Sequence, residues 1–337
     1  MTRLRVSGLE PDNLLAFLAL LGLLRALQAE RVARDAAAAP VRAVWSLDEP
    51  PVRPVLVLPG DRTRSEVAAA AAAGLDHLAA DHDFDGRLDL DYPPGEARVI
   101  LAEAAQGASS ASRGRADLIA ALMSDAAVRS RDDPESAKVE PTPLCLMFGQ
   151  GRQHFLGRLA DIVRMPAPPG PGKPAGSTRS ADRCLEDALF EPWRRRDPTP
   201  SFRWDIAEDV RYALRAGDPT SPAYKAHTQH GANRLAAAGI AALTAVPQGQ
   251  ARDVRLGIRG GAWDRDGFSL AWPIWRDPAT LWAILGLLDH PGLRTPGGLA
   301  HLGVEHVLVA RRISVLQFLN FGRARVISPE TAAGAGA

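Results

Sequence analysis

The feature that most constrains the fold is a long apolar segment near the start of the chain, residues 13–33. Its leucine and phenylalanine side chains would cover more than half of the circumference of an α-helix, at positions 14, 15, 17, 18, 21, 24 and 27. The apolar run is too short to span a bilayer, and the acids Glu10 and Asp12 precede it where a signal peptide carries positive charge. The segment therefore predicts a helix that the rest of the protein encloses on several sides, and no membrane association.

Short β-type patterns surround this helix in the sequence. Apolar or alternating residues predict strands at 3–7, 43–47 and 54–58, with Pro50 and Pro51 separating the last two. We expect these strands to pack on the helix. The other elements expected in this part are a strand at 86–92, a charged loop at 129–143 and helices at 65–80, 96–105, 115–128 and around 155–163.

A segment rich in proline and glycine interrupts the patterns at residues 165–181. The elements expected after it are a short helix around Leu185, helices at 232–245 and 279–289, and strands at 254–258, 268–272 and 304–313. The predicted class is therefore α+β, with strands packed around a buried N-terminal helix and a second mixed part after the linker. The predicted divisions are an N-terminal part at 1–164, a linker at 165–181, a C-terminal part at 182–328 and a disordered tail at 329–337.

Charge limits the kinds of partner that the chain can attract. The formal net charge of +1 excludes a strongly basic field over the whole protein, so contacts with nucleic acid must come from local patches. Nearly all basic residues are arginine, since only Lys138, Lys173 and Lys225 are lysine. Arginine grips a phosphate or a carboxylate at two points, whereas lysine acts as a point charge.

Arginines alternate with aromatic residues between positions 190 and 235, and Arg194, Arg195 and Arg196 are the densest group. Such a mixture can bind a nucleic-acid backbone and stack on bases. Residues 183–215, however, contain seven arginines and seven acids. Because this charge is balanced, an internal network of ion pairs is the favoured interpretation, and nucleic-acid binding is the alternative.

The stretch at residues 294–325 has a different balance, with five arginines and only Glu305 as an acid. Backbone contacts to nucleic acid require such an excess of positive charge. We therefore expect the main nucleic-acid contacts here, with Arg311, Arg312, Arg323 and Arg325 as candidates.

One motif raises the question of a metal ion. Asp81, Asp83, Asp85 and Gly86 match the beginning of a calcium-binding loop, in which carboxylates two positions apart converge on one cation. The twelfth position is Tyr92, where such a loop needs glutamate. A plain acidic turn before a strand is the favoured interpretation, and a metal site at Asp81, Asp83 and Asp85 is the alternative.

Other motifs do not assemble into a catalytic site. His227 and His230 are three positions apart but have no third ligand of defined spacing, and Gly149 and Gly151 before a helix fit ordinary turn residues. The sequence contains no nucleotide-binding P-loop and no serine nucleophile elbow. We predict no catalytic residues and no cofactor. The two cysteines, Cys145 and Cys184, do not suggest a disulfide framework, so a cytoplasmic protein is expected.

Eight sequence blocks in a fixed order resemble a known family. They are N-L-L-A-F-L-A-L-L-G-L-L-R (13–25), G-Q-G-R-Q-H-F-L (149–156), A-L-F-E-P-W (188–193), S-F-R-W-D (201–205), R-Y-A-L-R-A-G-D-P (211–219), G-A-N-R-L-A (231–236), W-P-I-W (272–275) and A-R-R-I (310–313). Together they resemble a CRISPR-associated family of type I-G, formerly I-U, systems that is named as an extension of the Cas helicase-nuclease. The resemblance covers nearly the whole chain.

The resemblance implies a place in RNA-guided DNA interference, where guide pairing reads the sequence while proteins hold backbones and recruit the nuclease. It implies other type I-G proteins as partners, and guide RNA or target DNA as further candidates. It implies no catalytic residues. The first hypothesis is therefore a non-enzymatic accessory or effector subunit that contacts nucleic acid or the Cas helicase-nuclease.

Two alternatives remain open at the level of sequence. One is a metal-dependent nuclease that uses the cluster at Asp81, His82, Asp83 and Asp85. The other is a pure scaffold that makes only protein–protein contacts.

Overall fold

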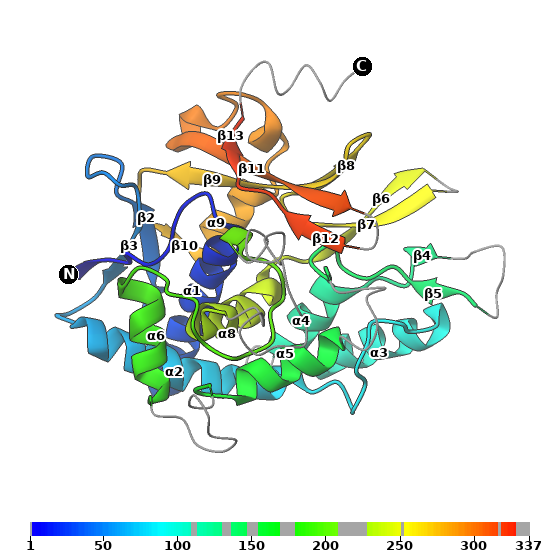
Figure 1. Cartoon of the computed structure of the whole chain (residues 1–337), viewed down its shortest axis with the longest axis horizontal. Coiled ribbons are helices and arrows are strands. Elements are labelled where there is room, and N and C mark those ends of the chain that lie inside the picture. Colours follow the sequence, from blue (N-terminus) through cyan, green and yellow to red (C-terminus); the bar gives the residue numbers. More distant parts are fainter. Residues whose placement is uncertain are drawn as a thin grey trace, which may run out of the picture.

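The computed structural model describes residues 2–108, 113–129, 136–146, 154–168, 179–207, 228–250, 253–315 and 318–327 (Figure 1). Its helices are α1 (Leu14–Arg34), α2 (Arg64–Leu78), α3 (Pro94–Gly107), α4 (Gly114–Leu122), α5 (Phe155–Arg164), α6 (Ala181–Phe190), α8 (His230–Gly239) and α9 (Leu281–Leu288), with short 3-10 helices η1 (Ala79–His82), η3 (Ile240–Ala242), η4 (Pro291–Arg294) and η5 (Ala300–Leu302). Its strands are β1 (Thr2–Arg5), β2 (Arg42–Trp45), β3 (Pro54–Leu58), β4 (Val128–Arg129), β5 (Lys138–Val139), β6 (Ala245–Gln250), β7 (Asp253–Ile258), β8 (Gly261–Asp264), β9 (Gly267–Trp275), β10 (Ala279–Thr280), β11 (Val304–Val315), β12 (Phe318–Phe321) and β13 (Arg325–Val326). Helices and antiparallel sheets occur together, so the predicted α+β class is confirmed.

Helix α1 lies at the centre of the helical layer. Its N-terminus is capped by Asn13, whose side chain accepts a hydrogen bond from the backbone N–H of Leu15 at 3.0 Å. Every residue from 14 to 24 is buried, as expected for a helix that is apolar on most of its surface. Helices α2 and α8 pack directly on α1. At Gly22 a Cβ atom would overlap the carbonyl of Leu235, so the backbones of α1 and α8 meet without a side chain between them.

The N-terminal sheet has the strand order β1-β3-β2-β10. Its first three strands come from the beginning of the chain, but β10 comes from far along it and pairs Ala279 with Ala43. The indole N–H of Trp275 also donates to the carbonyl oxygen of Ala43 at 2.8 Å. The two predicted parts of the chain therefore share one sheet, and their buried apolar residues form one large core. The predicted linker lies mostly outside the described residues, and the domain boundary there stays a prediction.

The C-terminal sheet has the strand order β12-β11-β9-β8, with β13 paired to the other part of β11. Figure 1 shows this sheet above the helices, with α1 beneath it. Residues 268–275 of β9 are all buried, so both faces of this strand are covered. Phe17 of α1 stacks on Trp272 of β9, with ring centroids 5.1 Å apart. The buried N-terminal helix thus fixes the position of the C-terminal sheet.

Two small hairpins, β4–β5 and β6–β7, lie at the same end of the molecule as β8 (Figure 1). The indole N–H of Trp263 in β8 donates to the carbonyl oxygen of Leu256 in β7 at 2.9 Å. The backbone N–H of Leu256 in turn donates to the carboxylate of Glu140, next to β5, at 2.9 Å. These bonds join three separate chain segments at the edge of the C-terminal sheet.

Most predicted elements are confirmed, including a strand at 54–58 with unchanged bounds. The strand predicted at 86–92 is wrong, because these residues form turns and irregular structure. Its start is bent by left-handed backbone at Asp85 and Gly86, with φ of 52° and 75°. The helix predicted at 115–128 ends early, at Leu122, where the carbonyl oxygen of Leu122 accepts from the backbone N–H of Thr142.

Within the described ranges no helix is both long enough and apolar enough to cross a membrane.

Candidate nucleic-acid interface

Trp263 is the centre of a group of charged side chains at the edge of the C-terminal sheet. Its ring lies edge-on to Phe268, the residue opposite it on β9, with centroids 5.4 Å apart. Phe268 is buried, and the bond from the indole N–H to Leu256 holds the polar edge of the ring. The indole is therefore fixed on two sides, while the side chain as a whole is only half-buried.

Two guanidinium groups lie over this ring. The ζ-carbon of Arg255, from β7, is 4.8 Å from the ring centroid, and that of Arg312, from β11, is 4.7 Å from it. Both distances fall within the range of cation–π contacts. Arg312 also lies 5.8 Å from the centroid of Phe268. The consecutive strands β7 and β8 and the distant strand β11 thus bring two positive charges to one aromatic ring.

Glu140 is an acid whose negative charge interacts with both of these arginines. Burial raises the pKa of Glu140, while the Leu256 N–H and the charges of Arg255, Arg312 and Arg129 lower it. Burial also disfavours the charged form of Arg312 and therefore lowers its pKa. The like charge of Arg255 lowers the pKa of Arg312 further. The charge of one carboxylate therefore acts on three arginines, of which Arg129 and Arg312 are half-buried and Arg255 is exposed. We call Glu140, Arg255, Trp263 and Arg312 the Trp263 cluster.

The cluster borders a groove of about 440 Å³ between β6–β7 and β8–β9. We call it the Trp263 groove, and it is lined by Gln248, Gly249, Arg255, Trp263, Asp264, Arg265 and Gly267. Its volume falls within the range of about 300–1,000 Å³ that small-ligand sites occupy. Asp264 is the acid in the lining, and Arg311 binds its carboxylate at 3.0 and 3.1 Å. The negative charge of the groove is therefore already matched.

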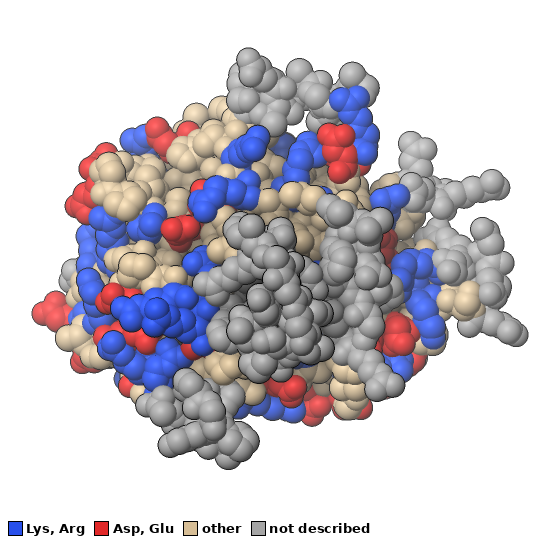
Figure 2. Space-filling view, viewed as in Figure 1, with Lys and Arg blue, Asp and Glu red and all other residues tan. Residues whose placement is uncertain are grey.

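The described side chains around the groove carry a surplus of positive charge. They include the guanidinium groups of Arg129, Arg255, Arg265, Arg311 and Arg312, and the carboxylates of Glu140, Asp264 and Asp266. Five cations stand against three anions, a surplus of two positive charges. Basic side chains also gather at the end of the molecule where Figure 1 places β4 and β5 (Figure 2).

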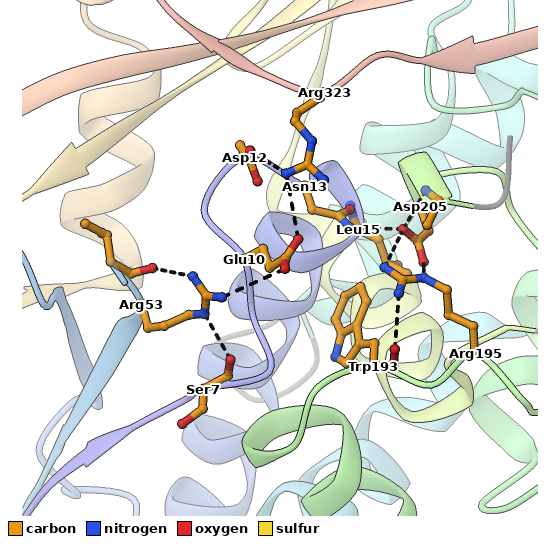
Figure 3. Close-up of polar contacts among 12 residues, drawn as sticks. Ser7, Glu10, Asp12, Asn13, Leu15, Arg53, Trp193, Arg195, Asp205 and Arg323 are labelled. Atoms are coloured by element: carbon orange, nitrogen blue, oxygen red, sulfur yellow. Dashed lines mark hydrogen bonds and ion pairs between the residues drawn. The ribbon is translucent and has the colours of Figure 1, made fainter. Parts of the chain in front are cut away.

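The four candidate arginines of the C-terminal stretch have different environments. Arg311 pairs with Asp264, and Arg312 belongs to the Trp263 cluster. Arg323 donates to the carboxylate of Asp12 at 2.6 Å (Figure 3), and this bond raises the pKa of Arg323. Arg325 is exposed in β13. Arg311 and Arg312 therefore each contact a residue that lines the groove, Asp264 and Trp263 respectively, and the other two arginines lie elsewhere.

Arg195, the middle residue of the group 194–196, forms an ion pair with the buried Asp205. Arg195 binds the carboxylate of Asp205 through two nitrogens, at 2.5 and 3.2 Å, and its guanidinium lies 5.6 Å from the ring centroid of Trp193 (Figure 3). The side chain of Asp205 is 0% exposed and also accepts from the side chain of Asn13 at 3.0 Å. We call Asn13, Trp193, Arg195 and Asp205 the Asp205 hub. It ties the segment after α6 to the start of α1.

Two further arginines near the hub also form ion pairs with acids of the protein. Arg179 pairs with Asp187 and Asp197, and Arg183 pairs with Glu186 and Asp187. For the described residues of this segment, the predicted network of ion pairs is confirmed. Arg194 and Arg196 are exposed, and no ion pair joins either of them to another described residue.

The acidic turn does not present converging carboxylates. Asp83 accepts from the backbone N–H of Asp85 at 3.1 Å, and Asp85 pairs with Arg115 at 3.1 Å. Burial raises the pKa of Asp81, which lies against Gly114. Among the residues placed by the structure, no group of three or more histidine, cysteine, aspartate or glutamate side chains is arranged to hold a metal ion. The geometry therefore lends no support to a cation at Asp81, Asp83 and Asp85.

The histidines near these segments have structural surroundings. His82 is buried and lies 3.2 Å from the carbonyl oxygens of Leu78 and Ala237, and burial lowers its pKa to about 4. His230 is buried and donates from Nε2 to the carbonyl oxygen of Met165 at 2.8 Å, and burial lowers its pKa to about 4 as well. Both rings are therefore neutral at neutral pH. His227, Gly149 and Gly151 lie outside the described residues.

Compared with models of protein families and with curated proteins, the sequence gives no match.

Three members of the Trp263 cluster were not among the residues predicted from sequence, namely Glu140, Arg255 and Trp263. Each of these three residues lies in a segment whose sequence pattern does not mark it as a binding residue. The one available signal was the sequence G-A-W-D-R-D-G at 261–267, in which an aromatic residue precedes a charged hairpin turn. Arg312 reaches it because β9 pairs with both β8 and β11, and Arg255 reaches it from the preceding strand β7.

Proposed function

We propose that this protein is a non-enzymatic accessory or effector subunit of a type I-G CRISPR system that contacts nucleic acid, the Cas helicase-nuclease, or both during DNA interference. The order of the eight sequence blocks motivates the choice of system. The observation that supports nucleic-acid contact is the combination of Arg255, Arg265 and Trp263 in the lining of one groove. A cytoplasmic location is part of the proposal, and it agrees with Cys145 and Cys184 both being buried thiols.

The physical argument rests on counter-charge. Arg255 and Arg265 line the groove with exposed side chains, so an anion that enters the groove meets positive charge. A phosphodiester backbone supplies anions at regular spacing and releases its own counterions when it binds. Arginine suits this role because its planar fork donates two parallel hydrogen bonds to one phosphate.

Binding over a range of salt concentrations tests the proposal. We expect labelled guide RNA or target DNA to bind at about 50 mM salt, with the logarithm of affinity falling linearly with the logarithm of salt concentration. Replacing Arg311 and Arg312 by glutamate should weaken binding to every sequence alike, because backbone contacts carry no sequence information. The same charge change at Arg98 and Arg113, which are exposed and pair with Asp125 and Asp117, is the matched control.

A pull-down with the other type I-G proteins tests the protein contacts. Retention of at least one of them is expected. If no nucleic acid binds at low salt and no partner is retained, the proposal is wrong.

A pure protein–protein scaffold is a second candidate, favoured by one observation. Arg195, Arg311 and Arg323, which the sequence offered for nucleic acid, are held by acids of the protein itself. This candidate predicts that the pull-down succeeds while salt-sensitive binding of nucleic acid is missing.

A further inference from the structure

We propose that the Trp263 groove is a site selective for single-stranded nucleic acid, in which a nucleobase extends the Arg255–Trp263–Arg312 stack and the arginines bind the adjoining phosphate. The inference rests on the proposed function but goes beyond it. Surplus charge alone would attract duplex and single strand alike, whereas an aromatic stack distinguishes them.

The stack is in place before any ligand arrives. Trp263 is held by its bond to Leu256 at 2.9 Å and by its edge-on contact with Phe268 at 5.4 Å. The guanidinium groups at 4.8 and 4.7 Å are in turn held by the ring. Binding a base would therefore immobilise few additional side chains, and this preorganisation favours affinity.

The chemistry of the stack suits a base. Single-stranded nucleic acids are bound by stacking their bases on aromatic rings or on the planes of arginine side chains. Here both kinds of surface lie against each other. In a duplex the faces of a base are covered by its neighbours, so this surface is accessible only to an unpaired base.

Charge favours a phosphate at the same place. Arg255 and Arg312 carry like charges over one ring, and the charge of Arg255 opposes ionisation of Arg312. Asp264 does not repel the ligand strongly because Arg311 binds its carboxylate at 3.0 and 3.1 Å. Arg265 is exposed in the lining of the groove. A phosphate in the groove would lie beside Arg255 and Arg265, which both line it.

The groove limits the ligand to a small segment. Its volume of about 440 Å³ is lined by polar and charged side chains together with one indole. Such a site accommodates one or two nucleotides rather than an entire helix. The longer path of the strand would then follow the basic edge of the sheet.

Fluorescence anisotropy with the whole chain tests the inference. The probes are single-stranded dT and U oligonucleotides and a blunt duplex of the same length, each at several salt concentrations. We expect both single strands to bind more tightly than the duplex. Comparison of the dT and U oligonucleotides shows whether DNA or RNA binds more tightly.

Substitutions at Trp263 should remove the selectivity. Trp263→Ala should weaken single-strand binding roughly 5- to 150-fold, the factor that stacking of one base contributes, with little change for the duplex. Trp263→Phe should recover part of the loss because it keeps a ring, and Arg255→Gln should weaken binding and reduce its salt dependence. The matched control is Trp282→Ala, since Trp282 is 65% exposed and lies under Arg113, whose ζ-carbon is 5.8 Å from the ring centroid.

The outcomes separate this inference from the proposed function. Equal affinity for duplex and single strand, or equal losses for Trp263→Ala and Trp282→Ala, would overturn the single-strand site while leaving general backbone binding intact. No binding to any probe at low salt would overturn both. If Trp263→Ala does not fold in a thermal-unfolding assay, Trp263→Phe and Arg255→Gln decide, and unchanged selectivity in both would refute the site.

Discussion

The Asp205 hub and the Trp263 cluster are built from the same residue types, tryptophan with arginine and an acid, but they differ in charge balance and exposure. In the hub, Arg195 binds a carboxylate that is 0% exposed and that also accepts from Asn13. In the cluster, Arg255 and Arg312 share a ring and have Glu140 as the nearby acid. The hub is a buried ion pair, whereas the cluster places arginines and an aromatic ring beside an open groove.

The difference shows that composition alone does not identify a nucleic-acid site. Arginine beside tryptophan forms an internal brace when a buried carboxylate lies opposite it. The same pair becomes a candidate for binding when positive charge exceeds negative charge at an open groove. Contacts, rather than the number of arginines, separate the two roles.

The largest expected effect would come from breaking the hub. Asp205→Ala should lower the free energy of unfolding by about 3–5 kcal/mol, because it leaves Arg195 and Asn13 without their buried partner. Denaturant titration measures this loss. Nucleic-acid affinity of the folded fraction should be unchanged, and a large loss of affinity would contradict the structural role of the hub.

Acid should destabilise the helical layer next to the hub. The pKa of His230 and of His82 is lowered to about 4, so the unfolded chain binds more protons than the folded chain between pH 6.5 and 4. The free energy of unfolding should therefore fall as the pH drops through this window, by up to about 3 kcal/mol for each histidine. His230→Asn should reduce the slope of stability against pH, and a slope equal to that of the unaltered protein would contradict the assignment.

Replacing Glu140 should increase the positive charge of the Trp263 cluster and thereby its affinity for nucleic acid. Glu140→Gln removes the acid that partly balances Arg255 and Arg312 and keeps an oxygen to accept the Leu256 N–H, which now lies 2.9 Å from the carboxylate. We expect affinity for nucleic acid to rise about 3- to 10-fold at low salt, and the gain to shrink as salt increases. Glu49→Gln, at an exposed acid near the N-terminal sheet, is the control. Weaker binding in Glu140→Gln would argue against a cationic site.

The smallest effect is expected for the exposed arginines beside the hub. Replacing Arg194 and Arg196 by alanine should change the free energy of unfolding by less than about 0.5 kcal/mol, because surface side chains without ion pairs contribute little. Affinity for nucleic acid should fall no more than about twofold if binding is confined to the groove. A loss as large as that in Trp263→Ala would extend the interface to the hub and break the comparison.

The sequence by itself determined the features that depend on neighbouring residues. The apolar run at 14–24 predicted a helix enclosed on several sides, and the β-rich run at 54–58 predicted a strand. The equal numbers of arginines and acids between 183 and 215 predicted ion pairs, which Arg195 and Asp205 form ten residues apart. These patterns are local, so they survive without knowledge of the fold.

Tertiary structure alone decided which acids lie beside which arginines. The excess of positive charge counted along 294–325 did not include Asp264 and Asp12, which come from other segments and bind Arg311 and Arg323. Nor does any sequence pattern place Arg312 on Trp263, because β8 and β11 come together only as the two neighbours of β9. Electrostatic balance depends on distances in space, and those distances are fixed only when the sheets have formed.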